Sequence, residues 1–186
     1  MTRSIYLRPW RIDVTTRDGV ATPVPVAALA RAIARAAEAG GAPSPASIGL
    51  ILSDDAELAA LTATHLGKPG PTDVLSFPLL SPEAFPAHDG GPARSAHSAR
   101  SLPEFPLPPG RRTHLGDLVI SVERAIEQAV EGRGGQTGDI RWAPADELRL
   151  LATHGVLHLC GWDHAEPGEE AAMRALESRL VEGGRH

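Results

Sequence analysis

The order of apolar and polar residues along the chain predicts strands that alternate with helices. Residues 10–16 alternate with a period of two, and residues 46–54 form a nearly continuous apolar run, as a largely buried strand does. Two further short strands are predicted over 72–79, where Pro78 ends the strand, and over 114–121.

Apolar residues that recur every three or four positions, between residues that typically begin and end helices, predict the helices. Asp54 and Glu57 have the spacing of a capping box, and Gly67 stands where that helix would end. Pro144 suits the first turn of a later helix. The predicted helices cover 24–41, 55–66, 122–135, 143–161 and 168–184. We therefore expect an α+β fold with a small mixed sheet of about four strands and about five helices.

Residues 81–113 show no such pattern. Proline, glycine and serine are dense there and no hydrophobic period survives, which is typical of a mobile loop. We expect a single domain over residues 1–186 with this segment as an insertion.

Composition narrows the functional classes. The chain has 186 residues, one cysteine (Cys160) and a net charge of −5. One cysteine excludes an intrachain disulfide and favours a reducing compartment. Neither a signal peptide nor a run of about 18 apolar residues is recognisable, so we expect a cytoplasmic protein that does not enter a membrane. The acidic balance does not itself indicate nucleic-acid binding.

Three histidines near the C-terminus form the most specific pattern. His154 and His158 are four residues apart, so on a helix both imidazoles project from one face. Gly161 can end the helix and turn the chain back, which brings His164 toward the same point. Three protein ligands with a fourth position open are typical of a catalytic zinc ion. We therefore predict one Zn²⁺ per chain on these three histidines.

The spacing H-x-x-x-H-x-x-G-x-x-H is that of the metzincin metalloproteases, so the predicted metal site is metzincin-like. Those enzymes carry a glutamate after the first histidine as general base, and here that residue is Gly155. A glycine transfers no proton, which disfavours peptidase activity. Gly155 indicates either tight packing against a neighbouring element or room beside the metal.

Three motifs in this order resemble the YbeY family of bacterial endoribonucleases. "HGVLHLCGWDH" is similar to the family signature H-G-x-L-H-L-x-G-[YF]-D-H, with Trp162 as the one departure. "GKPGPTDVLSFP" (67–78) and "LGDLVIS" (115–121) are similar to two further family segments. The resemblance implies a zinc-dependent endoribonuclease that prefers single-stranded RNA. It also implies a role in ribosomal RNA maturation and ribosome quality control, in the cytoplasm and in contact with the small ribosomal subunit.

One position departs from the family where activity is concerned. The family usually has an arginine directly before "GK", and here that residue is Leu66. Leucine cannot bind a phosphate or stabilise developing negative charge. Lys68 and His65 flank the position and are candidates for this catalytic role.

Three other polar residues are candidates for the site. Asp163 either orients an imidazole or takes a proton, as a catalytic residue, or else caps the turn. Asp73 and Ser76 lie on a strand that the resemblance places along the cleft, as substrate-binding residues. Turn chemistry before a strand accounts for Asp73 equally well.

Two other functions compete with a nuclease. Another zinc hydrolase, such as a peptidase or a deaminase, is disfavoured because both use a glutamate near the metal. A ribosome-assembly factor with a structural zinc and little catalysis is favoured by Leu66 and disfavoured by the open coordination position.

Overall fold

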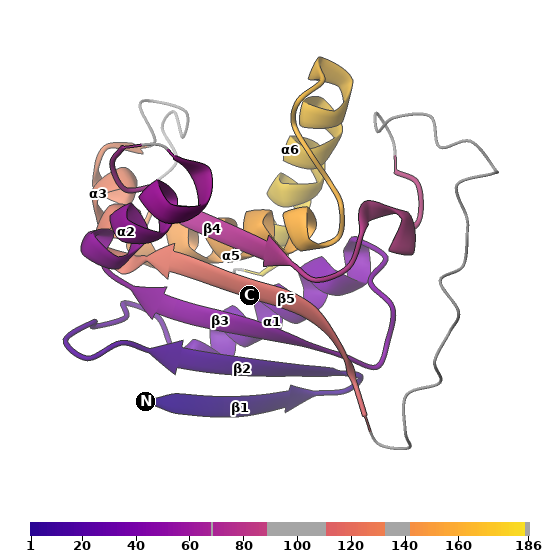
Figure 1. Ribbon diagram of the computed structural model, residues 1–186, viewed down its shortest axis with the longest axis horizontal. Coiled ribbons are helices and arrows are strands. Elements are labelled where there is room, and N and C mark those ends of the chain that lie inside the picture. The colour runs from indigo at the N-terminus through magenta and orange to yellow at the C-terminus, as the bar shows by residue number, and fades with distance from the viewer. Residues whose placement is uncertain (68, 89–110, 133–141, 185–186) are drawn as a thin grey trace.

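The computed structural model of the protein describes residues 1–67, 69–88, 111–132 and 142–184. A five-stranded mixed sheet forms its centre, in the order β1-β2-β3-β5-β4 (Figure 1). Strands β2, β3 and β5 run parallel, and β1 and β4 pair antiparallel at the two edges. The strands are Thr2–Leu7 (β1), Trp10–Thr16 (β2), Ala46–Ser53 (β3), Val74–Pro78 (β4) and Thr113–Ser121 (β5).

The α+β prediction is confirmed, and the expected number of strands was one too low. Strand β1 escaped the sequence pattern because it is an edge strand whose residues are mostly exposed, so few of its positions need to be apolar. It pairs with β2 residue by residue, from Thr2 opposite Thr15 to Leu7 opposite Trp10.

Five helices longer than one turn lie in the described part of the chain, close to their predicted positions. Asp54 accepts a hydrogen bond from the backbone N–H of Glu57 and so caps α2, and Gly67 follows the helix with a φ of 63°. The helices are Val26–Ala39 (α1), Asp55–Leu66 (α2), Val122–Val130 (α3), Pro144–Leu159 (α5) and Pro167–Glu182 (α6).

The core lies between the sheet and the helices α1 and α5, which cover the same face of the sheet (Figure 1). Alternate residues of the strands point into it, and the fully buried ones include Ile12, Ile48, Leu50, Leu118 and Ile120. Helix α5 is buried along most of its length, and α6 packs against its C-terminal half through Leu157, Met173 and Leu176. This arrangement holds α5 between α6 and the strands β4 and β5.

The predicted insertion lies only partly among the described residues. Its main part, 89–110, is outside them, while 81–88 contains a 3₁₀ turn at Pro82–Ala84 and the buried side chain of Phe85. Thr113 already belongs to β5. The packed segment therefore extends to His88, beyond the predicted start of the insertion.

No helix in the described ranges is both long enough and apolar enough to cross a membrane.

Candidate metal centre

His154 and His158 project from the same face of α5, one turn apart. Their Nε2 atoms lie 3.0 Å from each other, and the rings meet edge to face with centroids 4.5 Å apart. Two nitrogens that share a tetrahedral zinc ion at 2.0–2.1 Å would lie about 3.3 Å apart. The spacing of the two imidazoles therefore suits one shared ion.

The other nitrogen of each ring has its own acceptor. His154 Nδ1 lies 2.6 Å from Glu177 Oε1 on α6, and His158 Nδ1 lies 2.8 Å from the carbonyl oxygen of Trp162. An imidazole that donates from Nδ1 to a carboxylate or carbonyl keeps Nε2 free as a metal ligand. Two free lone pairs that face each other repel, and a cation between them removes the repulsion. The donor chemistry of the pair thus fits a metal ion.

His164 completes the group from the loop after α5. Gly161 has a φ of 79°, a left-handed conformation that glycine adopts without strain, and the chain reverses there. The backbone N–H of Trp162 then donates to the carbonyl of Leu157, which closes the turn. One ligand atom from each of His154, His158 and His164 lies within 4.8 Å of the others. The structure therefore brings together the three predicted histidines in positions that could bind a metal.

The loop that carries His164 packs against a buried pair of side chains, Glu169 and His88. Glu169 Oε1 accepts from the backbone N–H of Asp163 at 3.1 Å and lies 2.7 Å from His88 Nε2. The ring of His88 stacks on Trp162 with centroids 4.0 Å apart. Both partners of the pair are almost wholly buried, with side chains 7% and 4% exposed. The pair thus contacts the two residues that directly precede the third histidine.

Sequence reasoning missed Glu177, Glu169 and His88. The glutamates lie on the last predicted helix, where acids near the N-terminus look like ordinary dipole partners, and His88 lies in the supposed loop. A weak signal existed, because Glu169 and Glu177 are eight residues apart and so fall on one face with Met173 and Leu176.

Burial lowers the pKa of His158 below its usual 6.5, and the neighbouring His154 lowers it further, against the opposing hydrogen bond to Trp162. His158 is therefore neutral at pH 7, which is the form that binds a metal. His154 is half-buried and His164 is exposed. The group is therefore open to solvent on the side of His164.

Gly155 is explained by packing. A Cβ atom there would lie 2.8 Å from Leu118 Cδ2, 3.2 Å from Ser76 Oγ and 3.3 Å from Val74 Cγ2. Helix α5 thus packs so closely on β4 and β5 that a larger residue at this position would have to displace the side chain of Leu118. Of the two explanations for this residue, the structure supports tight packing.

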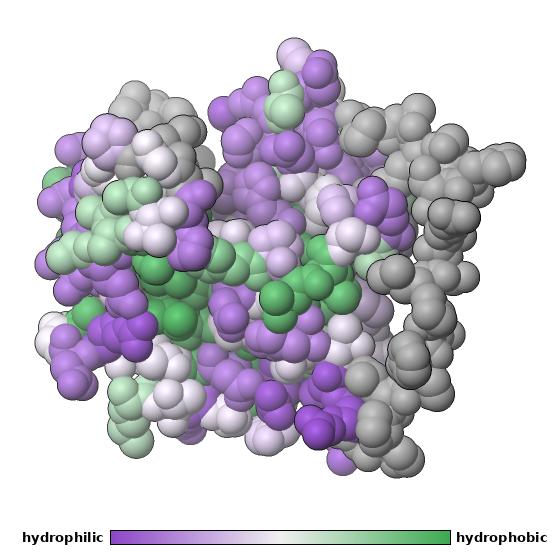
Figure 2. Space-filling model, in the orientation of Figure 1, coloured by the Kyte–Doolittle hydropathy of each residue, from purple (hydrophilic) through white to green (hydrophobic). Residues whose placement is uncertain are grey.

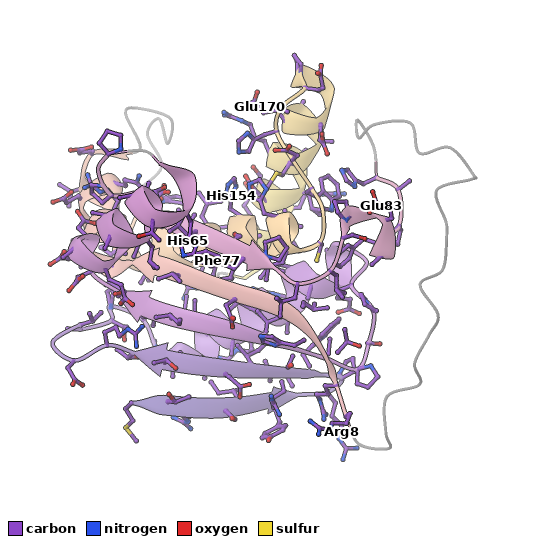
Figure 3. The ribbon with its side chains drawn as sticks, in the orientation of Figure 1. Arg8, His65, Phe77, Glu83, His154 and Glu170 are labelled. Atoms are coloured by element: carbon purple, nitrogen blue, oxygen red, sulfur yellow. The ribbon has the colours of Figure 1, made fainter. Side chains whose placement is uncertain are left out.

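His65 lies on the opposite side of a hollow from the histidines. It is exposed at the end of α2, and its ring meets Phe77 of β4 edge-on, with centroids 5.3 Å apart (Figure 3). The surface is hollowed between α2 and α6, with apolar side chains along the bottom (Figure 2). Lys68 and the side chain of Leu66 lie outside the described residues, so their catalytic roles stay predictions.

Asp163 and Ser76 hold the backbone of this region. Asp163 Oδ1 accepts from the N–H of His164 at 2.8 Å, which caps the turn. The Ser76 hydroxyl donates to the carbonyl of Gly155 at 3.1 Å and ties α5 to β4. The predicted roles of Asp163 in proton transfer and of Ser76 in substrate binding stay predictions.

Asp73 also has structural partners. Its carboxylate accepts from the backbone N–H of Val74, at 2.8 Å, and from the side-chain amide of Gln128 on α3, at 3.1 Å. These contacts anchor the start of β4.

Cys160 is fully buried, and desolvation raises the pKa of its thiol to about 12, so it is a core residue.

Comparisons with known proteins agree with these motifs. The family model described as "Endoribonuclease YbeY" matches residues 15–183. A Thermobifida fusca protein named Endoribonuclease YbeY is 37% identical over 94% of this chain and 94% of its own. A Salinispora tropica protein of that name is 41% identical over 73% of each chain. The solution structure of TM1509 from Thermotoga maritima shares the fold, with a TM-score of 0.51 and 19% identity over 94% of this chain and 88% of that one.

Proposed function

Because the chain belongs to the YbeY family, we propose that it is a zinc-dependent endoribonuclease that cleaves single-stranded RNA. We further propose that it acts in ribosomal RNA maturation and ribosome quality control in the cytoplasm, in contact with the small ribosomal subunit. The names of its relatives support RNA cleavage. The convergence of His154, His158 and His164 is the single observation that supports the metal.

The chain's own residues prepare the site for phosphodiester hydrolysis. A zinc ion held by the three histidines would supply a Lewis acid for a phosphoryl oxygen and an activated water. Glu177 and the Trp162 carbonyl orient the first two imidazoles, and Glu169 holds the loop of the third. The hollow beside His164 admits an RNA strand. Lys68, with His65, offsets the charge that develops on the phosphate.

The carboxylate that directly precedes the third histidine in the chain is the candidate for proton transfer. Asp163 is exposed and precedes His164 directly, and its Oδ1 atom accepts from the N–H of that residue. Its second oxygen is available to take a proton. Asp73, directly before β4, and Ser76 on β4 are proposed as substrate contacts, as the resemblance to the family implies.

The test combines metal content with two substrates. Wild-type protein and the His158→Ala variant are analysed for zinc and incubated with single-stranded RNA and with casein. We expect about one zinc per chain in the wild type, RNA cleavage without casein cleavage, and loss of both zinc and cleavage in the variant.

Two results would contradict the proposal. Full zinc occupancy in the His158→Ala protein would exclude this ligand set. Zinc binding without RNA cleavage would favour the ribosome-assembly factor, for which Leu66 in place of the family arginine is the supporting observation.

A further inference from the structure

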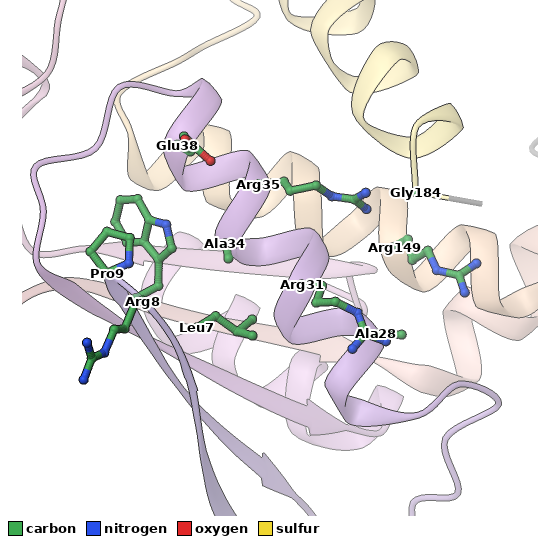
Figure 4. A pocket seen from close by; sticks show the side chains of 11 residues that line it. Leu7, Arg8, Pro9, Ala28, Arg31, Ala34, Arg35, Glu38, Arg149 and Gly184 are labelled. Atoms are coloured by element: carbon green, nitrogen blue, oxygen red, sulfur yellow. The ribbon is translucent and has the colours of Figure 1, made fainter. Parts of the chain in front are cut away.

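A hollow of about 560 Å³ lies between the β1–β2 hairpin, α1 and the end of α6 (Figure 4). The fold concentrates positive charge there, although the chain as a whole has a net charge of −5. Four arginines and a single acid, from separate segments of the chain, contribute to its lining: Arg8, Arg31, Arg35, Arg149 and Glu38.

Three of these arginines form what we call the arginine cluster: Arg31, Arg35 and Arg149. Arg31 and Arg35 are one turn apart on α1, where like charges repel. Arg35 points toward the end of α6 at Gly184, whereas Arg8 points away from it (Figure 4). The cluster thus gathers cations from two helices against their mutual repulsion.

The cluster has few negative partners. Arg149 pairs with Asp146 at 3.2 Å, but no ion pair of Arg31 or Arg35 is found among the described residues. One terminal nitrogen of Arg35 donates to the carbonyl of Gly183 at 3.1 Å. Its Nε atom is buried and has no acceptor in the described ranges. A buried donor without a partner is rare in proteins and often marks the place of a water or an ion.

The surroundings of the histidines are, by contrast, acidic. Asp163, Glu166 and Glu170 follow or flank His164, and the nearby Arg174 already pairs with Glu170 at 2.6 Å. RNA is a polyanion whose binding depends largely on cations that contact its phosphates. Among the described residues, the arginine cluster offers cations for phosphate binding, whereas the surroundings of the three histidines are acidic.

We propose that the arginine cluster binds phosphate groups of the RNA backbone as a second contact area outside the histidine centre. The guanidinium fork matches a phosphate with two parallel hydrogen bonds. The choice of RNA, and not a free anion, rests on the proposed function of the chain.

The position of the cluster makes RNA binding depend on RNA length. Arg149 precedes His154 by five residues on α5, hence by about 7.5 Å along the helix and about 140° around it. The cluster and the histidines therefore lie on different sides of α5, and a strand that contacts both has to pass around the helix. A long single strand can do so, whereas an RNA of about four nucleotides, about 14 Å at 3.4 Å each, is expected to contact one area at a time.

The test measures RNA binding and cleavage separately. Fluorescence anisotropy is recorded with single-stranded RNA of about 20 and of about four nucleotides, and gels confirm that the probe is intact. We expect Arg31→Glu and Arg149→Gln together to weaken binding of the longer RNA about tenfold and to lower the salt dependence by about 0.7 per lost phosphate contact. Cleavage of the short RNA should not change.

Arg3→Glu is the matched control, because Arg3 is exposed on β1 and does not line the hollow. Equal effects of Arg31→Glu and Arg3→Glu on the longer RNA overturn the proposal. The proposal is also overturned if inorganic phosphate binds the cluster but the substitutions leave the affinity for RNA unchanged. Should no form of the protein cleave RNA while the cluster variants still lose affinity, the proposed nuclease function fails and the binding site stands. Arg31→Gln repeats the test if the charge reversal lowers the melting temperature.

Discussion

The Nδ1 atom of His154 lies 2.6 Å from a carboxylate oxygen of Glu177, which is 23 residues further along the chain. The carboxylate is largely buried, with its side chain 12% exposed. This contact aligns one candidate ligand from a second helix. It makes α6 part of the candidate metal centre, although α6 carries none of the three histidines.

We expect Glu177→Ala to lower zinc affinity about 10- to 100-fold, because the imidazole loses both its orientation and its negatively charged acceptor. Glu177→Gln keeps an acceptor oxygen without the charge, so its loss should be smaller. Titration against a competing chelator at constant pH measures both. Glu170→Ala on the same helix is the control, since Glu170 pairs with Arg174 at the surface. An equal effect of Glu170→Ala would show that the general charge of α6 matters, and not the contact with His154.

The buried pair of Glu169 and His88 leads to a second prediction. Glu169→Ala leaves the N–H of Asp163 and the His88 ring without their acceptor. We expect the free energy of unfolding to fall by about 1–3 kcal/mol, mainly because the His88 side chain stays buried without its partner. Urea unfolding of the zinc-loaded and the chelator-treated protein measures the loss. We expect the larger loss in the zinc-loaded protein, since the loop also positions His164.

His88 variants separate the two contacts of that residue. His88→Phe keeps an aromatic ring on Trp162 and removes the hydrogen bond to Glu169, whereas His88→Ala removes both. His88→Phe should retain more stability than His88→Ala. If the two variants match the wild type, the segment 81–88 does not support the metal loop.

Substitution of Gly155 by alanine has two opposing effects on stability, one from helix propensity and one from packing. Alanine is about 1 kcal/mol better than glycine inside a helix. The added methyl group would, however, lie 2.8 Å from a carbon of the fully buried Leu118, and such overpacking typically costs about 1–3 kcal/mol. We expect Gly155→Ala to be less stable by about 0–2 kcal/mol in urea unfolding. A gain of about 1 kcal/mol would mean that the helix and sheet move apart freely.

The same geometry predicts that restoring the metzincin residue does not restore a peptidase. In Gly155→Glu the side chain starts in the gap between α5 and the sheet, beside Val74, Ser76 and Leu118. Burial of a carboxylate there should destabilise the protein well beyond the alanine variant. Casein should remain intact, and digestion of casein by a folded variant would contradict this account.

Local patterns predicted most of the fold and the three histidines. The helical spacing of His154 and His158 and the glycine at 161 depend on neighbours in sequence, so they are readable there. The resemblance to the family added the order of the motifs. In contrast, Glu177 contacts His154 across 23 residues, and His88 contacts Glu169 across 81 residues, which no local pattern encodes.

The difference between local patterns and distant contacts also explains why strand β1 was missed and why Gly155 had two explanations. Strand β1 has few buried positions, so its apolar signal is weak although β2 pairs with it throughout. For Gly155 the sequence left two explanations, because the gap that requires glycine is made by Leu118 and Ser76 from other elements. Contacts of this kind become visible only when the sheet and helices are placed together.

Leu66 stands where the resemblance to the YbeY family places an arginine, so we expect it to affect the rate of RNA cleavage. It ends α2, next to His65, whose ring lies against Phe77 at the bottom of the hollow. An arginine there would add one charge-assisted contact to the phosphate. The loss of a comparable contact in other enzymes costs about 10²–10³ in rate. We therefore expect Leu66→Arg to raise kcat for single-stranded RNA and to leave the zinc content unchanged, with a smaller effect on KM.

Two further variants show whether another cation has taken over. Leu66→Gln adds polarity without charge and should leave kcat near the wild-type value. Lys68→Ala should lower kcat if Lys68 now contacts the phosphate. If kcat is unchanged in Leu66→Arg and the Lys68→Ala variant is inactive, Lys68 has replaced the family arginine. The natural protein is then a competent nuclease. If neither substitution matters and cleavage also survives His158→Ala, the cleavage comes from a contaminating enzyme, and the assembly-factor function is the one that remains.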